Sequence, residues 1–71
     1  SNENQPPEVV LRYLNTLLLL QPDSPQEHLN RALMYMRLKQ NAKAKEDVRW
    51  LLENDPPGFN RDRLMDLFRR L

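Results

Sequence analysis

His28, Arg31 and Asp47 are the side chains whose types and spacing could do chemistry in this chain. His28 is the only histidine among the 71 residues, and there is no cysteine. A histidine acts as a general base when a nucleophile or an orienting acid lies within its reach. Glu27 adjoins His28, but neighbouring residues of a helix point to different sides. We therefore expect no catalytic residue, and we interpret His28 as a packed or partly exposed side chain.

Arg31 and Asp47 have a more specific structural interpretation. Both fall on helices that we expect to be antiparallel neighbours. Arg31 can then pair with Asp47, or it can donate to a carbonyl group at a helix end. A partly buried ion pair adds little net stability, but it helps to fix the register of two helices. An alternative function for Arg31 is to bind the carboxylate of a partner protein.

The composition argues against several classes of site. Without cysteine the chain has no disulfide or thiolate metal site, and one histidine cannot bind a structural zinc ion alone. We expect no metal and no cofactor. The 11 basic and 10 acidic residues give a net charge of +1, whereas a nucleic-acid-binding domain carries a clear basic excess on one face. A group of basic residues is interrupted by acids, so it indicates a solvated face rather than a phosphate track; it contains Lys39, Lys43, Lys45 and Arg49.

No segment has the length of a membrane span. The longest apolar run, Leu17–Leu20, is four residues, and a spanning helix needs about 20. The absence of cysteine is compatible with the cytoplasmic location that we expect. Ser1 and Asn2 resemble the remnant of a cleaved tag, and we expect residues 1–5 to be disordered.

The hydrophobic pattern predicts four helices and no strand. The predicted ranges are residues 8–21, 25–40, 42–54 and 60–71, with apolar residues at steps of three and four. Ser24 and Glu27 have the spacing of a capping box at the start of the second helix. Asn41 suits a left-handed exit from that helix, and Asn60 is the predicted cap of the fourth.

Pro22 and Pro56 end two of these helices and stand 34 residues apart, which is the period of the tetratricopeptide repeat (TPR). The stretch that begins at Pro25 resembles this repeat. The resemblance implies two antiparallel helices that approach closely at small residues, with an aromatic and an apolar side chain filling the space between them. His28 and Arg31 depart from the pattern, since large apolar residues are usual at their positions. The residues in register are Ala32, Tyr35, Ala44, Val48 and Pro56.

A second resemblance covers about residues 8–57. It is to the C-terminal TPR segment of bacterial proteins that join a transglutaminase-like domain to TPRs. Arg31 is unusual in a general TPR but ordinary in that family, whereas Ala32 replaces the family's glycine. The resemblance implies a fragment of a longer protein with an upstream domain of papain-like fold. The matching residues are Pro22, Pro25, Glu27, Arg31, Leu33, Tyr35, Ala44, Asp47 and Pro56.

The predicted partner-binding surface lies on the second helix. Leu29, Leu33 and Met36 form an apolar row, and Gln26 flanks it. TPRs that hold a C-terminal carboxylate carry lysine and asparagine there. An apolar row suits an upstream domain of the same chain, an apolar helix of another protein or a second copy, unless it is ordinary core. Trp50 is a further candidate, either as a partner anchor or as a half-buried surface residue.

The first helix resembles the second half of a repeat whose first half is absent from this chain. We therefore expect its apolar stripe to be partly open, so that a second copy could cover it and form a homo-oligomer. The stripe contains Val10, Leu14 and Leu17.

The sequence thus predicts an all-α protein with about four helices in an antiparallel, TPR-like array, an alpha-alpha superhelix. Within residues 6–71 we expect a half repeat (6–24), a full repeat (25–58) and a capping helix (59–71) with a polar outer face. The predicted function is a non-catalytic interaction or scaffold module for another protein or domain. The alternative is an auxiliary domain of a transglutaminase-like, papain-fold enzyme or regulator. A small nucleic-acid-binding protein is a third hypothesis, which requires steeply salt-dependent binding.

Overall fold

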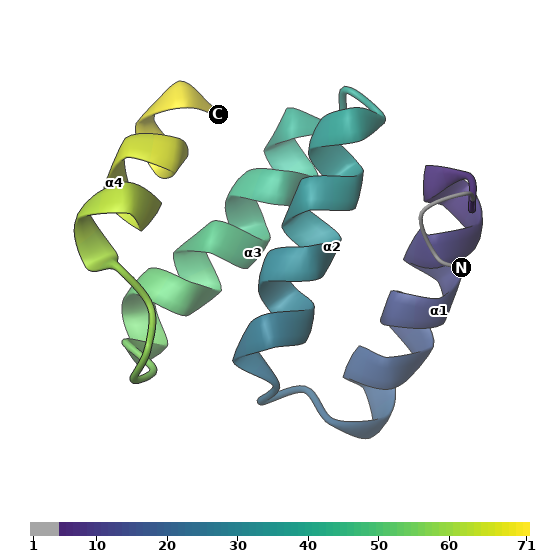
Figure 1. Cartoon of the computed structure of the whole chain (residues 1–71), viewed down its shortest axis with the longest axis horizontal. Helices are drawn as coiled ribbons and strands as arrows, with labels where there is room; N and C mark the ends of the chain where they lie inside the picture. Colours follow the sequence, from purple (N-terminus) through teal and green to yellow (C-terminus); the bar gives the residue numbers. More distant parts are fainter. Residues whose placement is uncertain (1–4) are drawn as a thin grey trace.

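Four helices make up the part of the chain that this computed structural model describes, residues 5–71. They are α1 (Pro7–Leu20), α2 (Pro25–Arg37), α3 (Asn41–Asn54) and α4 (Arg61–Arg70). Successive helices run antiparallel and follow one another in chain order, with α1 at one edge and α4 at the other (Figure 1). Residues 5–71 contain no strand. The predicted all-α array is confirmed. The predicted disorder of residues 1–5 falls, apart from Gln5, outside the described residues.

The starts of the helices follow two different local rules. Proline occupies the first turn of α1 and of α2, where its missing N–H costs no helical hydrogen bond. Asn60 caps α4 as predicted, and its side chain accepts from the Arg63 N–H at 3.1 Å. Ser24 is the N-cap of α2 but makes no side-chain cap bond, so the predicted capping box is wrong. Glu27 instead accepts from the Asn30 amide at 2.9 Å.

The connection between α2 and α3 begins earlier in the sequence than predicted. Helix α2 ends at Arg37, not at Gln40, and α3 begins at Asn41. Lys39 has the left-handed conformation, with φ of 61°, that the sequence assigned to Asn41. The Gln40 N–H then donates to the Tyr35 carbonyl at 2.8 Å, which satisfies a free carbonyl of the last helical turn.

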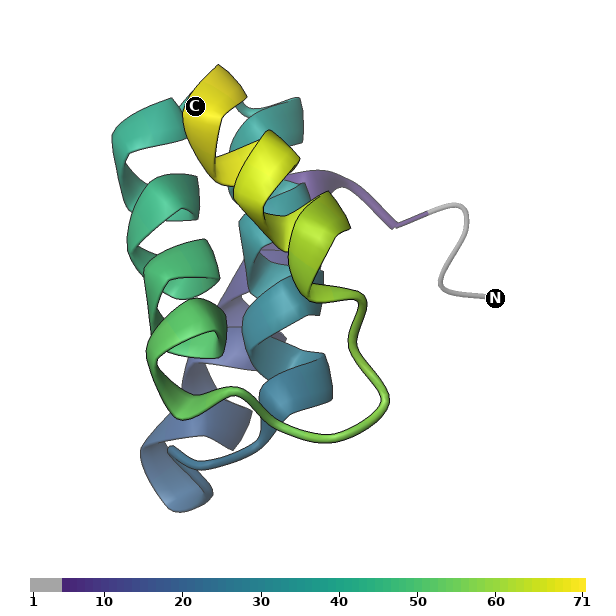
Figure 2. The same cartoon turned by 90° about the vertical axis from the view of Figure 1, so that its left-hand side faces the viewer.

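The central hydrophobic core lies between α2, α3 and α4. Ala32 and Ala44 are fully buried, so α2 and α3 approach each other at two small side chains. Figure 2 shows α4 packed across the pair formed by α2 and α3. The buried members of this core are Ala32, Ala44, Val48, Leu51 and Leu64.

Helix α1 contacts α2 outside this central core. Leu14 and Leu18 are buried, with exposed fractions of 3% and 6%, and neither belongs to the central core. The stripe that we expected to be partly open is therefore closed at Leu14, where α1 packs against α2. Val10 and Leu17 are half-buried. The apolar side chains that α1 does expose are Val9, Tyr13, Leu19 and Leu20.

Candidate functional site

A polar cluster centred on His28 joins α2, α3 and the turn that precedes α2. The Nδ1 atom of His28 lies 2.9 Å from Oδ1 of Asp47 on α3. Its Nε2 atom lies 2.7 Å from the carbonyl oxygen of Pro22. His28 and Asp47 are only 7% and 3% exposed. Both ring nitrogens are therefore engaged inside the fold, and the ring has no nitrogen free for a substrate.

Arg31 extends the same cluster to α1. Its Nε donates to Oδ2 of Asp47 at 2.8 Å, and its Nη2 donates to Oδ1 at 2.7 Å. Its Nη1 donates to Oδ1 of Asn15 on α1 at 3.1 Å. The hydrogen bond to Asp47 raises the pKa of Arg31 above its ordinary value, although partial burial acts in the opposite direction. Of the two contacts considered for Arg31, the structure has the ion pair with Asp47. The negative charge of this carboxylate compensates the positive charge of the guanidinium.

Trp50 covers one face of the His28 ring. The two ring centroids are 4.0 Å apart and the planes are inclined by 16°. Trp50 is half-buried and packs against the central core. The TPR pattern has tryptophan at the position of His28; here a tryptophan from α3 stacks on the histidine instead. One face of Trp50 is therefore already occupied within the chain.

The arrangement of this cluster does not suit catalysis. The His28–Asp47 contact resembles the orienting half of a catalytic triad, but Nε2 binds a backbone carbonyl and has no nucleophile. Within residues 5–71 there is no group of three potential metal ligands, and no buried side-chain nitrogen or oxygen lacks a partner. The hydrogen bonds of the cluster instead link α1, α2, α3 and the turn before α2 to one another.

The predicted partner-binding row is divided between different parts of the surface. Gln26 and Leu29 line an open hollow of about 430 Å³ between α2 and α4. Leu33 faces the other side, where it lines a hollow with α1 and is 41% exposed. Met36 is half-buried and packs against the central core. We call the first hollow the α2–α4 groove; its lining residues are Gln26, Leu29, Gly58, Phe59, Asn60, Arg63, Leu64 and Leu67.

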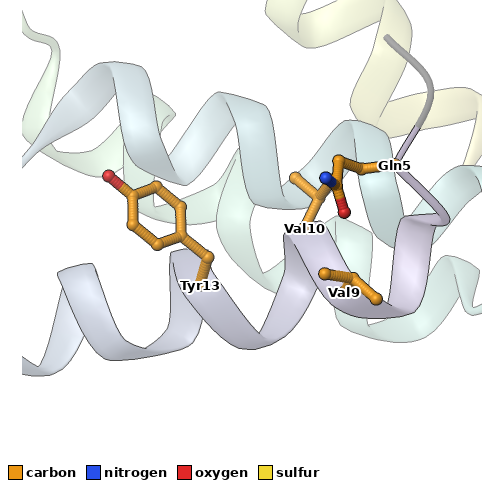
Figure 3. Close-up of a pocket in the computed structure, with 4 residues that line it drawn as sticks. All are labelled: Gln5, Val9, Val10 and Tyr13. Atoms are coloured by element: carbon orange, nitrogen blue, oxygen red, sulfur yellow. The ribbon is translucent and has the colours of Figure 1, made fainter. Parts of the chain in front are cut away.

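A second hollowed surface lies on α1. Val10 and Tyr13 line a hollow with Leu33 and other residues of α2. The same two residues, with Gln5 and Val9, line a smaller hollow of about 310 Å³ at the start of α1. Figure 3 shows these side chains projecting from the first turns of α1 and the segment before it. Apolar side chains make up much of this surface, and of the predicted row only Leu33 borders it.

The remaining repeat residues have packing functions. Tyr35 is half-buried, and the cations of Arg31 and Lys43 lie 5.9 and 5.8 Å from its ring centroid. Val48 is fully buried. Pro22 contributes its carbonyl to the His28 contact, and Pro56 is half-buried in the loop before α4.

The basic group identified from the sequence has a partner inside the fold. Lys45 and Arg49 lie over the ring of Phe68 on α4, at 4.6 and 5.8 Å from its centroid. Their positive charges therefore interact with an aromatic face rather than forming a continuous basic track.

Sequence reasoning missed two features of the polar cluster. It did not connect His28 to Asp47, although His28 and Arg31 share a helix face at a spacing of three residues and Arg31 was paired with Asp47. It also missed Asn15, which lies three residues before the buried Leu18 and therefore shares its face of α1. A polar side chain on a buried face needs a partner, and this requirement is the signal that could have identified Asn15.

Comparison with protein families matches residues 2–69 to the tetratricopeptide-repeat model. Comparisons with curated proteins and with solved structures gave no match. No helix among the described residues combines the length and apolar character needed to cross a membrane. The match extends over nearly the whole chain and agrees with the all-α array. The chain therefore belongs to the tetratricopeptide-repeat family.

Proposed function

We propose that this chain is a non-catalytic protein-binding module whose binding surface is the α2–α4 groove. Membership of the repeat family supports a protein-interaction function. In this proposal residues 25–58 form the full repeat, and α4 is a capping helix that contributes one wall of the groove. The observation that carries the proposal is the composition of the groove, in which apolar side chains form the floor and polar ones form the rim.

The floor of the groove is a part of the core surface that remains in contact with solvent. Leu29, Phe59 and Leu67 are half-buried and pack against the central core, while Leu64 is almost fully buried. A half-buried apolar side chain gains further free energy when a ligand removes the rest of its surface from water. An apolar helix or extended segment of a partner protein is therefore the ligand that this floor favours.

The rim of the groove supplies polar contacts. Gln26, Asn60 and Arg63 are exposed, and each comes from a different place around the hollow. The side chain of Gln26 bonds Asn30, at 3.1 Å, and leaves its own carbonyl oxygen available at the surface. Arg63 is the cation of the rim and would favour a partner residue with a carboxylate next to the apolar segment.

Selection from a displayed random-peptide library tests this proposal without a known partner. Peptides selected on the wild-type chain should carry apolar residues, and their binding should weaken at least about tenfold in Gln26→Trp and in Arg63→Glu. Both positions are exposed, so these variants should keep the wild-type helical circular dichroism. Glu53→Lys, on the exposed face of α3, is the matched control. Selected peptides that bind all four proteins equally would refute the groove as the binding surface.

We also propose a second copy of the chain as a ligand of the exposed α1 surface. Tyr13, Leu19 and Leu20 are 63%, 84% and 75% exposed. No charged residue occurs between Arg12 and Asp23, so two copies of this surface would meet without charge repulsion. The self-association predicted from the sequence therefore shifts from the Leu14 stripe to this outer surface.

A second candidate function is that of an auxiliary domain in a longer transglutaminase-like protein. It is supported by the resemblance to that family, in which arginine is ordinary at Arg31, and by the contact of Arg31 with the matching Asp47. The natural protein's residues upstream of Glu3 test it. A domain there with a cysteine and a histidine in a papain-like arrangement would support the auxiliary function, and an unrelated sequence would contradict it.

A further inference from the structure

We propose that two copies of the chain pair through their α1 helices in an antiparallel, two-fold arrangement, around a seam formed by Val9, Tyr13, Thr16 and Leu20. The inference rests on the proposed second-copy ligand of the exposed α1 surface, and it specifies which side chains meet. It is carried by the spacing, the exposure and the charge of the residues on the outer face of α1.

The four seam residues form one stripe on the outer face of α1. Their spacing of four, three and four residues keeps them on the same side of the helix, as in the seam of a coiled coil. All four are exposed. The buried Leu18 is nine residues from Val9, about two and a half turns, and therefore lies on the opposite side of the helix. Helix α1 forms one edge of the array, so none of the four described helices covers the stripe (Figure 1).

The spacing of the seam is the same in both chain directions, which suits pairing with a second copy. In an antiparallel pair with the two-fold axis between Tyr13 and Thr16, Tyr13 of each copy lies opposite Thr16 of the other. Val9 of each copy then lies opposite Leu20 of the other. A large ring therefore faces a small side chain at the centre of the seam, and two apolar side chains face each other at each end.

The polar member of the seam, Thr16, can enter such an interface with its hydrogen satisfied. Its Oγ1 donates to the Arg12 carbonyl of the same helix at 3.2 Å. Because this bond remains when the interface forms, burial of Thr16 costs less than burial of a free hydroxyl. The seam has no charged member, so its burial removes no charge from water.

One flank of the seam favours the antiparallel order. Arg12 and Leu19 are seven residues apart and therefore lie on the same flank, and Leu19 is the most exposed of the large apolar side chains. In an antiparallel pair this flank of one copy meets the same flank of the other, so the apolar stem of Arg12 can cover Leu19 of the other copy. In a parallel pair the two flanks would lie on opposite sides of the seam, and Leu19 would stay in contact with water.

The charge of Arg12 suits the same arrangement. Helical side chains tilt toward the N-terminus of their own helix, so in an antiparallel pair Arg12 leans toward the C-terminus of the other α1. A helix C-terminus carries partial negative charge, and the last turn of α1 contains no basic residue of its own. Each copy therefore supplies a cation to the last turn of the other. Since each copy contributes one helix of 14 residues, the interface is small and the association weak.

Cysteine pairing tests the arrangement, because the chain has no cysteine of its own. Val9→Cys and Leu20→Cys are mixed in equal amounts under mild oxidation at millimolar concentration. A disulfide needs Cα atoms within about 7 Å, whereas the two copies of position 9 are about 16 Å apart along the axis of the proposed pair. We expect the mixed disulfide to exceed each homodimer at least about tenfold, whereas random collision favours it only about twofold.

The matched control is Glu53→Cys, on the exposed face of α3, which should form no disulfide beyond that of random collision. An excess of the two homodimers over the mixed disulfide would overturn the antiparallel order and leave α1 as the self-association surface. A mixed fraction no larger than random collision gives would overturn the pairing altogether. Sedimentation of the wild-type chain then shows separately whether a second copy binds at all, and neither result concerns the α2–α4 groove.

Paired charge substitutions give a second readout of the same arrangement. Val9→Lys alone places a cation opposite Leu20 of the other copy and should weaken association at least about tenfold. When Leu20→Glu is added to the same chain, opposite charges face each other at both ends of an antiparallel pair, and association should recover at least about fivefold. Sedimentation velocity measures both variants. No recovery in the double variant would overturn the proposal, because only a parallel pair places like charges opposite each other.

Discussion

Arg31 on α2 binds the carboxylate of Asp47 on α3 with two hydrogen bonds, from Nε to Oδ2 at 2.8 Å and from Nη2 to Oδ1 at 2.7 Å. The two helices also meet at fully buried alanines, which provide close contact but no directional preference. The ion pair supplies the direction, because a guanidinium and a carboxylate bind in a planar, paired geometry. His28 and Asn15 connect the pair to the rest of the fold.

Replacement of Arg31 by methionine should destabilise the chain by about 1–2 kcal/mol. Removing one partner of a buried pair leaves the other charge without compensation, at a cost of about 3–5 kcal/mol. The cost is smaller here because the side chain of Arg31 is 23% exposed and His28 still contacts Asp47. Chemical denaturation of the variant measures the change.

The matched control is Arg69→Met. Arg69 pairs with Asp66 at 3.6 Å, but both side chains are more than half exposed. Exposed pairs contribute about 0–1 kcal/mol, so this variant should be close to the wild type. Equal stability of Arg31→Met and Arg69→Met would contradict the structural role of the buried pair.

The stability deficit of Arg31→Met should not change between about pH 9 and about pH 10.5. Asp47 raises the pKa of Arg31 above its ordinary value, chiefly through the hydrogen bond between them. A raised pKa of a basic group means that its contribution is complete below the unfolded-state value and is lost only as the pH rises through the higher folded-state value. Arg31→Lys provides a contrast, because lysine has an ordinary pKa of about 10.4 and titrates within this range. A deficit that shrinks steadily over this range for Arg31→Met would show that the guanidinium loses its charge earlier than the structure implies.

Asn60→Ala should cost about 1 kcal/mol of stability, whereas Ser24→Ala should cost little. Both residues are N-caps, but only the Asn60 side chain accepts a backbone hydrogen bond. Loss of such a bond at a helix N-terminus typically costs about 1 kcal/mol. Urea unfolding of the two variants compares them under the same conditions, and a larger loss for Ser24→Ala would contradict the description of the α2 start.

The chain should associate weakly at high concentration, and Tyr13→Asp should abolish this association. The substitution places a charge in the exposed, uncharged surface of α1, where a second copy would have to bury it. Sedimentation velocity over a range of concentrations measures the effect. Glu53→Lys, on α3, is the control and should associate like the wild type. A wild-type chain that sediments as a monomer at every concentration would refute the α1 interface.

The helices and the core could be predicted from the sequence because periodicity and proline positions determine them. The 34-residue spacing of Pro22 and Pro56 placed Ala32 and Ala44 at a close helix contact, and both are fully buried. The left-handed exit could not be placed, because Lys39 occupies it in place of the glycine or asparagine that usually marks such a residue.

The surfaces could be predicted less well because they depend on the angles between helices. Leu29 and Leu33 are one helical turn apart and were assigned to one row. In the structure α4 approaches the side of Leu29 and α1 approaches the side of Leu33, so the two residues line different hollows. The partners of His28 were missed for a related reason, since Pro22, Asp47 and Trp50 come from a turn and from another helix.

NMR mapping of a selected peptide on the isotopically labelled chain tests the proposed binding function most directly. The account predicts that the largest shift changes gather on Gln26, Leu29, Phe59 and Arg63, which line the α2–α4 groove. Changes that gather instead on Tyr13 and Leu33, with the groove residues unaffected, would contradict the account and would place peptide binding in the hollow between α1 and α2.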